Sequence, residues 1–212
     1  INKLRSANCE AIIMGTIVKD TILAYTKARQ IGWDDVIIIG QVASYHPVIA
    51  SQPNGVTDGF LTFAQFPSPD KETCEKHVCD WIERYEAIYG STPNIGSAYG
   101  YMYADITAKA IEIAGNDLNT DTFITALESI KDYQLIFGDG ILSFGPEKHL
   151  GSNDAYLFEV INGKFVQISD QDKKKINEVI DLIFAKYKST LVPIEASHGD
   201  LINFNTIKDT YN

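Results

Sequence analysis

The chain has 212 residues, of which 45% are hydrophobic, and its formal net charge is −10. This length and composition are typical of a globular protein that buries a core, so they exclude a disordered chain. The net negative charge repels nucleic-acid phosphates and anionic lipid. We therefore expect no nucleic acid among the partners and no membrane binding through a polybasic surface.

A strand–helix–strand unit is predicted near the amino terminus. Residues 10–15 form a short apolar run that ends in glycine, and residues 36–40 repeat this pattern, which is typical of strands buried on both faces. Between them, Lys19–Ile31 has the apolar spacing of a helix that packs on the sheet. Because such crossovers connect parallel strands, we expect Ala11–Met14 and Val36–Ile39 to be parallel neighbours.

The middle of the chain is predicted to be mostly helical. Val56–Phe66 has strand character and ends at Pro67–Asp70, a cluster that breaks strands and starts helices. Apolar residues at helical spacing follow, with glycine after the first two segments. The predicted helices are Lys71–Tyr89, Ser97–Ala114 and Asp121–Ile130, the last with Thr120 as its N-cap.

The last third of the chain contains the clearest local signal. Tyr156–Ile161 and Lys164–Ile168 are strand-like and are separated by Asn162-Gly163, which predicts a type I′ hairpin because both turn residues need positive φ. Gly140–Phe144 is predicted as a further strand, and Gln171–Lys188 as an amphipathic helix. The apolar residues aligned on that helix are Ile176, Val179, Ile180, Ile183 and Phe184.

The three cysteines are not expected to form an internal disulfide. Cys74 and Cys79 fall in a segment predicted as helix, where residues five apart are separated by about 7.5 Å along the axis and lie on different faces. Cys74 and His77 could share one helix face, but a structural zinc site needs about four ligands. We therefore expect no metal site.

Motifs for catalysis are absent from the sequence. None of the four histidines belongs to a nucleophile motif, and neither a Gly-x-Ser-x-Gly elbow nor a phosphate-binding loop is present. The abundant carboxylates are typical of solvated surfaces. The sequence therefore predicts no catalytic residue and no cofactor, and the chain is not expected to be an enzyme.

The carboxyl ends of the two parallel strands are the predicted ligand site, because open α/β sheets bind ligands there. Small or polar residues follow a glycine in both loops, which would allow hydrogen bonds from side chain and backbone. The alternative is that Gly15 and Gly40 only form strand-to-helix turns, and that Thr16 and Gln41 only satisfy turn backbone groups. The candidate ligand contacts are Thr16, Ile17, Gln41 and Ser44.

The order of these elements resembles the second half of the type I periplasmic solute-binding proteins, the branched-chain amino-acid and amide receptors of ABC transporters. The resemblance extends from about Ala7 to Ser169, and its specificity lies in the order and spacing of the pieces. The matching pieces are Glu10–Gly15, Thr26–Gly32, Ile37–Gly40, Val56–Thr62, Trp81–Gly90 with Pro93, Ala98–Tyr101, Ala110–Gly115, Phe137–Gly140, Leu142–Phe144 and Phe158–Phe165.

The resemblance implies an α/β fold of two lobes with parallel sheets, closing on a ligand by hinge motion. The fold would be partial, with the N-terminal half absent and with a C-terminal β-hairpin and an extra helix. Residues 1–58 would form part of ligand-binding lobe II as a βαβ unit, and 59–139 the crossover strand and helices of lobe I. Residues 140–170 would supply the return strands and hairpin of lobe II, and 171–212 a C-terminal helix and extension.

The resemblance also implies a function. The chain would be an extracytoplasmic solute-binding protein, periplasmic or extracellular with any signal peptide outside this chain, that holds a small polar ligand for an ABC importer. Its partners would be the small-molecule ligand and the ABC transporter permease or a missing N-terminal half. The alternative is the ligand-sensing domain of a signalling receptor on the same fold, to which the Gln171–Lys188 helix could connect a membrane segment.

Two features separate this sequence from the amino-acid binders of that family. Those proteins often carry an acid in the loop after the second strand, whereas Gly40–Ser44 contains none. They also commonly have an aromatic residue near the position of Ile17, and none is present. A neutral amide, a carboxylate or an aromatic acid is therefore expected to fit at least as well as an α-amino acid.

Overall fold

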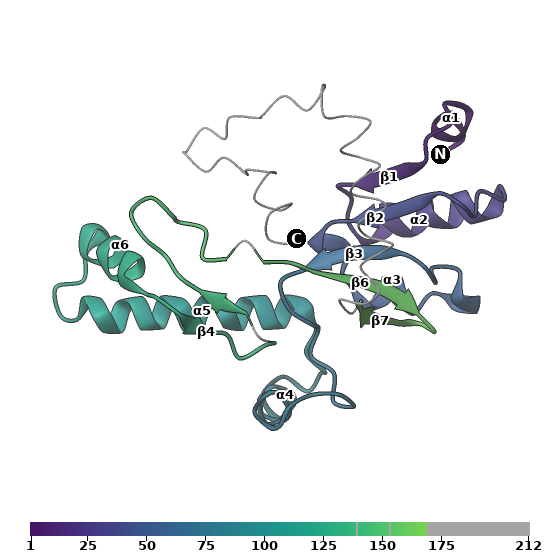
Figure 1. Cartoon of the computed structure of the whole chain (residues 1–212). Coiled ribbons are helices and arrows are strands. Elements are labelled where there is room, and N and C mark those ends of the chain that lie inside the picture. The colour runs from purple at the N-terminus through teal and green to yellow at the C-terminus, as the bar shows by residue number, and fades with distance from the viewer. Residues whose placement is uncertain (139, 153, 169–212) are drawn as a thin grey trace.

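A computed structural model describes residues 1–138, 140–152 and 154–168. Its main feature is a five-stranded mixed sheet in the order β1-β2-β3-β6-β7. The first three strands run parallel, and the last two are antiparallel to their neighbours (Figure 1). The strands are β1 (Ala11–Met14), β2 (Ile37–Gly40), β3 (Leu61–Ala64), β6 (Tyr156–Ile161) and β7 (Lys164–Gln167).

The strand–helix–strand unit predicted at the amino terminus is confirmed. β1 and β2 pair in parallel from Ala11 opposite Ile37 to Met14 opposite Gly40. The helix between them, α2 (Val18–Gln30), turns its buried residues toward one face of the sheet. A short helix α1 (Asn2–Ser6) precedes the unit.

The β6–β7 hairpin is also confirmed. Asn162 has φ 51° and Gly163 has φ 79°, the two positive values that a type I′ turn requires. The connection from β2 to β3 contains three short helices. These are η1 (Val42–Ser44), α3 (Pro47–Ala50) and η2 (Pro53–Gly55).

Three helices and a small two-stranded sheet form the second region of the molecule (Figure 1). The strand expected from Gly140 forms, but it pairs with the preceding strand and does not join the five-stranded sheet. The assignment of residues 140–170 to one lobe therefore stays a prediction. The elements are α4 (Lys76–Tyr89), α5 (Ile95–Ala114), α6 (Thr120–Ser129), β4 (Tyr133–Gln134) and β5 (Ile141–Leu142).

The N-cap predicted for α6 is wrong by one residue. The Asn119 side-chain oxygen accepts hydrogen bonds from the backbone N–H groups of Asp121 and Thr122. The Thr122 hydroxyl accepts in turn from the Asn119 N–H, which completes a capping box. Thr120 is thus the first helical residue, and Asn119 is the N-cap because its side chain reaches two free N–H groups.

The prediction that no internal disulfide forms is wrong. Cys74 and Cys79 are bonded, with Cα atoms 5.5 Å apart. The helix predicted to begin at Lys71 begins at Lys76 instead, as α4. Cys74 therefore lies in the turn before the helix and Cys79 in its first turn, so the helical spacing that excluded the bond does not apply. Cys9 is free.

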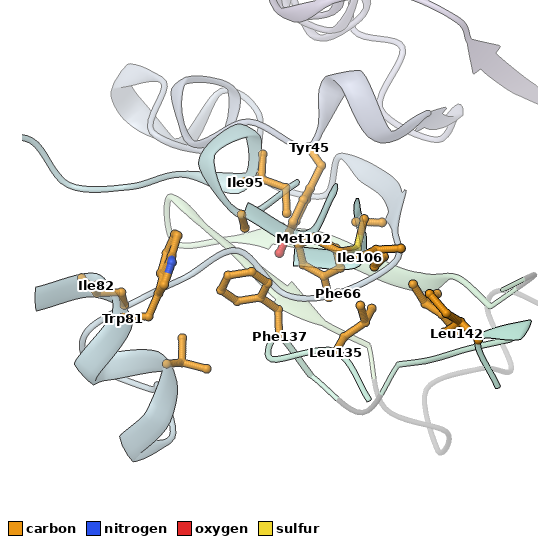
Figure 2. Packing of buried hydrophobic residues seen from close by; sticks show 14 of the residues in the cluster. Tyr45, Phe66, Trp81, Ile82, Ile95, Met102, Ile106, Leu135, Phe137 and Leu142 are labelled. Carbon is orange, nitrogen blue, oxygen red and sulfur yellow. The ribbon is translucent and has the colours of Figure 1, made fainter. Parts of the chain in front are cut away.

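The buried hydrophobic residues form two main cores. One lies between the sheet and α2 and α3, and it includes Tyr25, Ile38 and Phe60. The other extends from the sheet into the helical region, where side chains of α4 and α5 meet Phe66 and Phe137 (Figure 2). Both regions of the molecule therefore bury their own apolar side chains.

Within the described residues, no helix is long and apolar enough to cross a membrane. The helix predicted over Gln171–Lys188 lies outside the described residues.

Candidate functional site

The loops after β1 and β2 lie side by side at the carboxyl edge of the parallel strands. This follows from the register, which places Met14 opposite Gly40 as the last pair of the two strands. Thr16 is half-buried, Ile17 is 62% exposed, and Gln41 is half-buried. The sequence prediction that these loops meet at one edge is confirmed, whereas their contact with a ligand stays a prediction.

Gln41 connects the two loops. Its side-chain Nε2 donates to the backbone oxygen of Thr16 over 3.3 Å. Its Oε1 accepts from the Ala43 N–H at 3.0 Å, which caps η1. The Gln41 side chain therefore fixes the spacing of the two loops, and a change there would move any group that the loops present to a ligand.

Ser44 lies beneath the loop and has no exposed surface. Its hydroxyl donates to the Gln41 backbone oxygen at 2.6 Å and lies 3.1 Å from the Thr62 hydroxyl. Thr62, on β3, also donates to the Gln41 oxygen at 3.0 Å. These bonds hold the Gln41 backbone on the sheet, so in this conformation Ser44 supports the loop and is not at its surface.

The two glycines of the loops differ in their surroundings. A Cβ at Gly40 would collide with Ser44 Oγ and would lie 2.7 Å from Phe60 Cζ. Gly40 is therefore required by the packing of this chain itself. A Cβ at Gly15 would meet nothing within 4 Å. Of these two glycines, only Gly15 has open space beside its backbone that a ligand could fill.

The first turn of α2 opens onto the same edge without a side-chain cap. Ile17 occupies the N-cap position, and no side chain there bonds to the free N–H groups of the helix. The helix N-terminus carries a partial positive charge and attracts carboxylate or phosphate groups. Asp20 lies in this first turn and offsets part of that charge. Thr16 Oγ1 lies 2.8 Å from the buried Thr21 hydroxyl, which orients the loop before the helix.

Tyr45 joins the loop after β2 to the segment that follows β3. Its hydroxyl accepts a hydrogen bond from the Ser68 N–H at 3.0 Å, and its ring packs on Phe158 and Phe165. Burial raises the pKa of Tyr45 to about 12, so the hydroxyl is neutral at ordinary pH. The candidate site is thus attached to the crossover between the two regions.

A pocket of about 380 Å³ lies elsewhere, between the segment after β3 and the β4–β5 connection. Its wall includes Pro67, Asp70, His77 and Phe137 but none of the predicted site residues. His77 Nε2 lies 2.9 Å from the Ile136 backbone oxygen. The described part of the chain contains no group of three or more residues able to hold a metal ion.

Sequence reasoning missed Thr62, Thr21 and Tyr45 as parts of this site. Thr62 lies in a strand that the pattern identifies, but only the β2–β3 pairing brings it under Gln41. Thr21 is recognisable only once its helix is placed against the loop. A polar residue at an apolar position of a predicted strand is the signal that could have indicated Thr62.

Comparison with known proteins agrees with this architecture. The chain belongs to a family of binding proteins. It is a member of the periplasmic binding protein family, whose model matches residues 1–164. This confirms the predicted family and the type I fold class. A search of curated proteins found no match.

Solved structures share the fold. A leucine-binding protein from Thermotoga maritima is 20% identical with a TM-score of 0.64, covering 79% of this chain and 46% of its own. A branched-chain amino acid ABC transporter protein from Thermus thermophilus, with bound valine, is 16% identical with a TM-score of 0.67 and coverages of 79% and 47%. An extracellular ligand-binding receptor from Rhodopseudomonas palustris is 17% identical, with a TM-score of 0.64 and coverages of 79% and 49%. The chain therefore spans about half the length of these proteins.

Proposed function

We propose that this chain holds a small polar ligand at the edge formed by the loops after β1 and β2, as part of an extracytoplasmic solute-binding protein that serves an ABC importer. The observation that carries the proposal is the bridge from Gln41 to Thr16, which joins the two loops beside the uncapped start of α2. The family membership supports binding rather than catalysis.

The geometry supports a ligand that carries a carboxylate or an amide. The free N–H groups at the start of α2 suit an acceptor oxygen, and a carboxylate gains from the helix dipole as well. The loop after β2 offers no acidic side chain for an ammonium group. The proposal therefore includes amino acids, amides and carboxylates. Amino acids and carboxylates would both make the contact through their carboxylate group.

Two of the structural relatives bind aliphatic amino acids. One is named a leucine-binding protein, and another was solved with bound valine. Since each is 20% identical or less, they support the fold, and their ligands are only starting points for a screen. The permease of an ABC transporter, or the N-terminal half of the two-lobed fold, would complete the assembly outside the cytoplasm.

A ligand-sensing domain of a signalling receptor is the second candidate. The relative from Rhodopseudomonas palustris is described as an extracellular ligand-binding receptor, a description that does not specify transport. The two functions share the same ligand site. They differ in the partner, so co-purification of a permease supports the first and coupling to a signalling domain supports the second.

The test begins with native mass spectrometry of the protein as purified, to find a bound small molecule. Calorimetric titration with that molecule, or with valine, leucine, acetamide and benzoate if none is found, then compares wild type with Gln41→Ala. Loss of the bridge should weaken binding about 5- to 30-fold, at roughly 1.4 kcal/mol per decade.

The thermal midpoint without ligand should change little in Gln41→Ala, because the bridge lies at the half-buried edge of the sheet. Thr107→Ala is a matched control, since it removes a side chain-to-backbone bond to Tyr103 on the exposed side of α5. Equal affinities of Gln41→Ala and wild type, or turnover of any ligand, would contradict the proposal.

A further inference from the structure

The five-stranded sheet has a second apolar face, opposite to the one that α2 and α3 cover. Side chains alternate along a strand, and paired residues share a face, so the register defines this set. We call it the outer sheet face. Its larger apolar side chains are those of Ile13, Ile37, Ile39, Leu61, Phe63, Leu157 and Val166, and the same register places Ala11, Glu159, Ile161 and Lys164 on it.

The outer sheet face is buried at its centre and open at its rim. Ile39, Leu61 and Leu157 are 8%, 4% and 6% exposed, whereas Ile13 and Val166 at the edges are 69% and 44% exposed. Among the described residues, this cluster contains only strand residues and Ile168, and no described helix contributes to it. Side chains stand upright and side by side on a strand, so burial this complete requires a layer above them.

The chain itself passes onto this face. The Ile168 N–H donates to the Leu157 oxygen at 2.9 Å, which extends the hairpin by one pair beyond Gln167. Ile168 therefore shares a face with Leu157, and its side chain packs against the central cluster. The next residue begins a segment that continues to residue 212, beyond the family match, which ends at 164.

We propose that the segment after Ile168 covers the outer sheet face, with the apolar residues of 176–184 as the docking side. Its pattern fits that role. Ile176, Val179, Ile180, Ile183 and Phe184 recur at the spacing that forms one face of a helix, whereas Glu178 falls on the opposite face.

The dimensions also fit. A helix over residues 171–188 would be about 27 Å long at 1.5 Å per residue. Five strands at about 4.8 Å spacing are roughly 19 Å across. One such helix therefore spans the sheet from β7, where the chain leaves, to β1, where Ile13 is exposed. The segment is tethered at Ile168, so it competes with any separate partner at a high effective concentration.

The experiment places a photo-reactive p-benzoyl-phenylalanine at position 13 of the full chain, where the exposed isoleucine tolerates replacement. Irradiation followed by peptide mapping should give cross-links to residues 173–188 of the same chain at every protein concentration. The same probe at position 23 is the control, because Leu23 is 58% exposed on α2, which packs on the other face. Position 23 should give no cross-link to that segment.

Two further variants test the docking side. Ile180→Gln should lower the position-13 cross-link yield at least about twofold, because weaker docking reduces the docked population. Glu178→Gln places the same side chain on the opposite face and should leave the yield unchanged. Absence of a cross-link to 173–188, cross-links only between two copies or to another protein, or equal loss in both variants would overturn the proposal. None of these outcomes depends on ligand binding at Gln41.

Discussion

Two regions of this molecule are stabilised in different ways. The sheet region is the five-stranded sheet with α2 and α3, and the helical region consists of α4, α5, α6 and the β4–β5 pair. In the sheet region, β1, α2 and β2 are consecutive, and their apolar residues meet after one short crossover. The helical region has a more aromatic core, in which Phe137 lies 4.9 Å from the Trp81 ring and 5.4 Å from the Phe66 ring. These three residues come from three separate segments (Figure 2). The helical core therefore depends on contacts between segments that are separate in the chain.

The largest expected effect follows from that dependence. Phe137 is 2% exposed, and its replacement by alanine leaves a cavity among aromatic rings. Phe137→Ala should lower the free energy of unfolding by about 3–5 kcal/mol. Hydrogen exchange should show the loss first in α4 and α5, with β1 and β2 still protected.

Phe60→Ala is the matched control in the other core. Phe60 has no exposed surface and packs edge-on against Tyr25. This variant should expose the amides of α2 and β2 first. If both variants lose protection everywhere at the same rate, the two cores unfold as one unit and the comparison fails.

The junction of the two regions should respond to pH through Tyr45. Burial raises its pKa to about 12 in the native protein, against about 10 in the unfolded chain. Below pH 10 the hydroxyl is protonated in both states and the stabilisation is fully present. Between pH 10 and 12 only the unfolded chain releases the proton, so up to about 2–3 kcal/mol of stability is lost.

Urea unfolding across pH 8 to 12 measures this effect. Tyr45→Phe should give a flatter stability profile above pH 10 than wild type, since phenylalanine has no proton to lose. Tyr103→Phe is the control at a 60% exposed position and should keep the wild-type slope. A Tyr45→Phe profile that falls as steeply as wild type would show that other groups cause the alkaline loss.

The disulfide should contribute less than either core. Cys74 and Cys79 enclose a short loop, for which the loss of unfolded-chain entropy corresponds to about 2 kcal/mol. The double variant Cys74→Ser, Cys79→Ser should lose that amount, mostly by loosening the start of α4. Cys9→Ser, which removes the free thiol, should change the unfolding free energy little. If the double variant were as stable as Cys9→Ser, the disulfide would not be stabilising the start of α4.

The sheet region could be predicted from the sequence because its signals are local. Two apolar runs ending in glycine and one helix between them determine the parallel pair, and Asn162-Gly163 determines the hairpin. The start of α4 could not be predicted, since the helical spacing continues back to Lys71 and only tertiary structure ends it at Lys76. The two site loops were expected to be neighbours, but the burial of Ser44 depends on Thr62 from a third strand.

The smallest stability effect concerns how the helices of the two regions begin. In the helical region, Asn94 caps α5 with bonds from the Gly96 and Ser97 N–H groups. In the sheet region, the N-cap of α2 is Ile17, whose backbone is extended at φ −93° and ψ 179° and could hold a capping side chain equally well.

Ile17→Asn should therefore stabilise the ligand-free protein by about 1 kcal/mol, because little apolar surface is lost at a side chain that is 62% exposed. The asparagine side-chain oxygen would also accept hydrogen bonds from the α2 N–H groups that we assign to the ligand, so ligand binding should weaken. Ile17→Asp should weaken it further for a carboxylate ligand, since the added negative charge repels it at close range. Thermal unfolding and calorimetric titration of both variants measure the two effects separately. A gain in stability with unchanged affinity would mean that the start of α2 is open for a reason other than ligand binding, and that the ligand contacts lie with Thr16 and Gln41 alone.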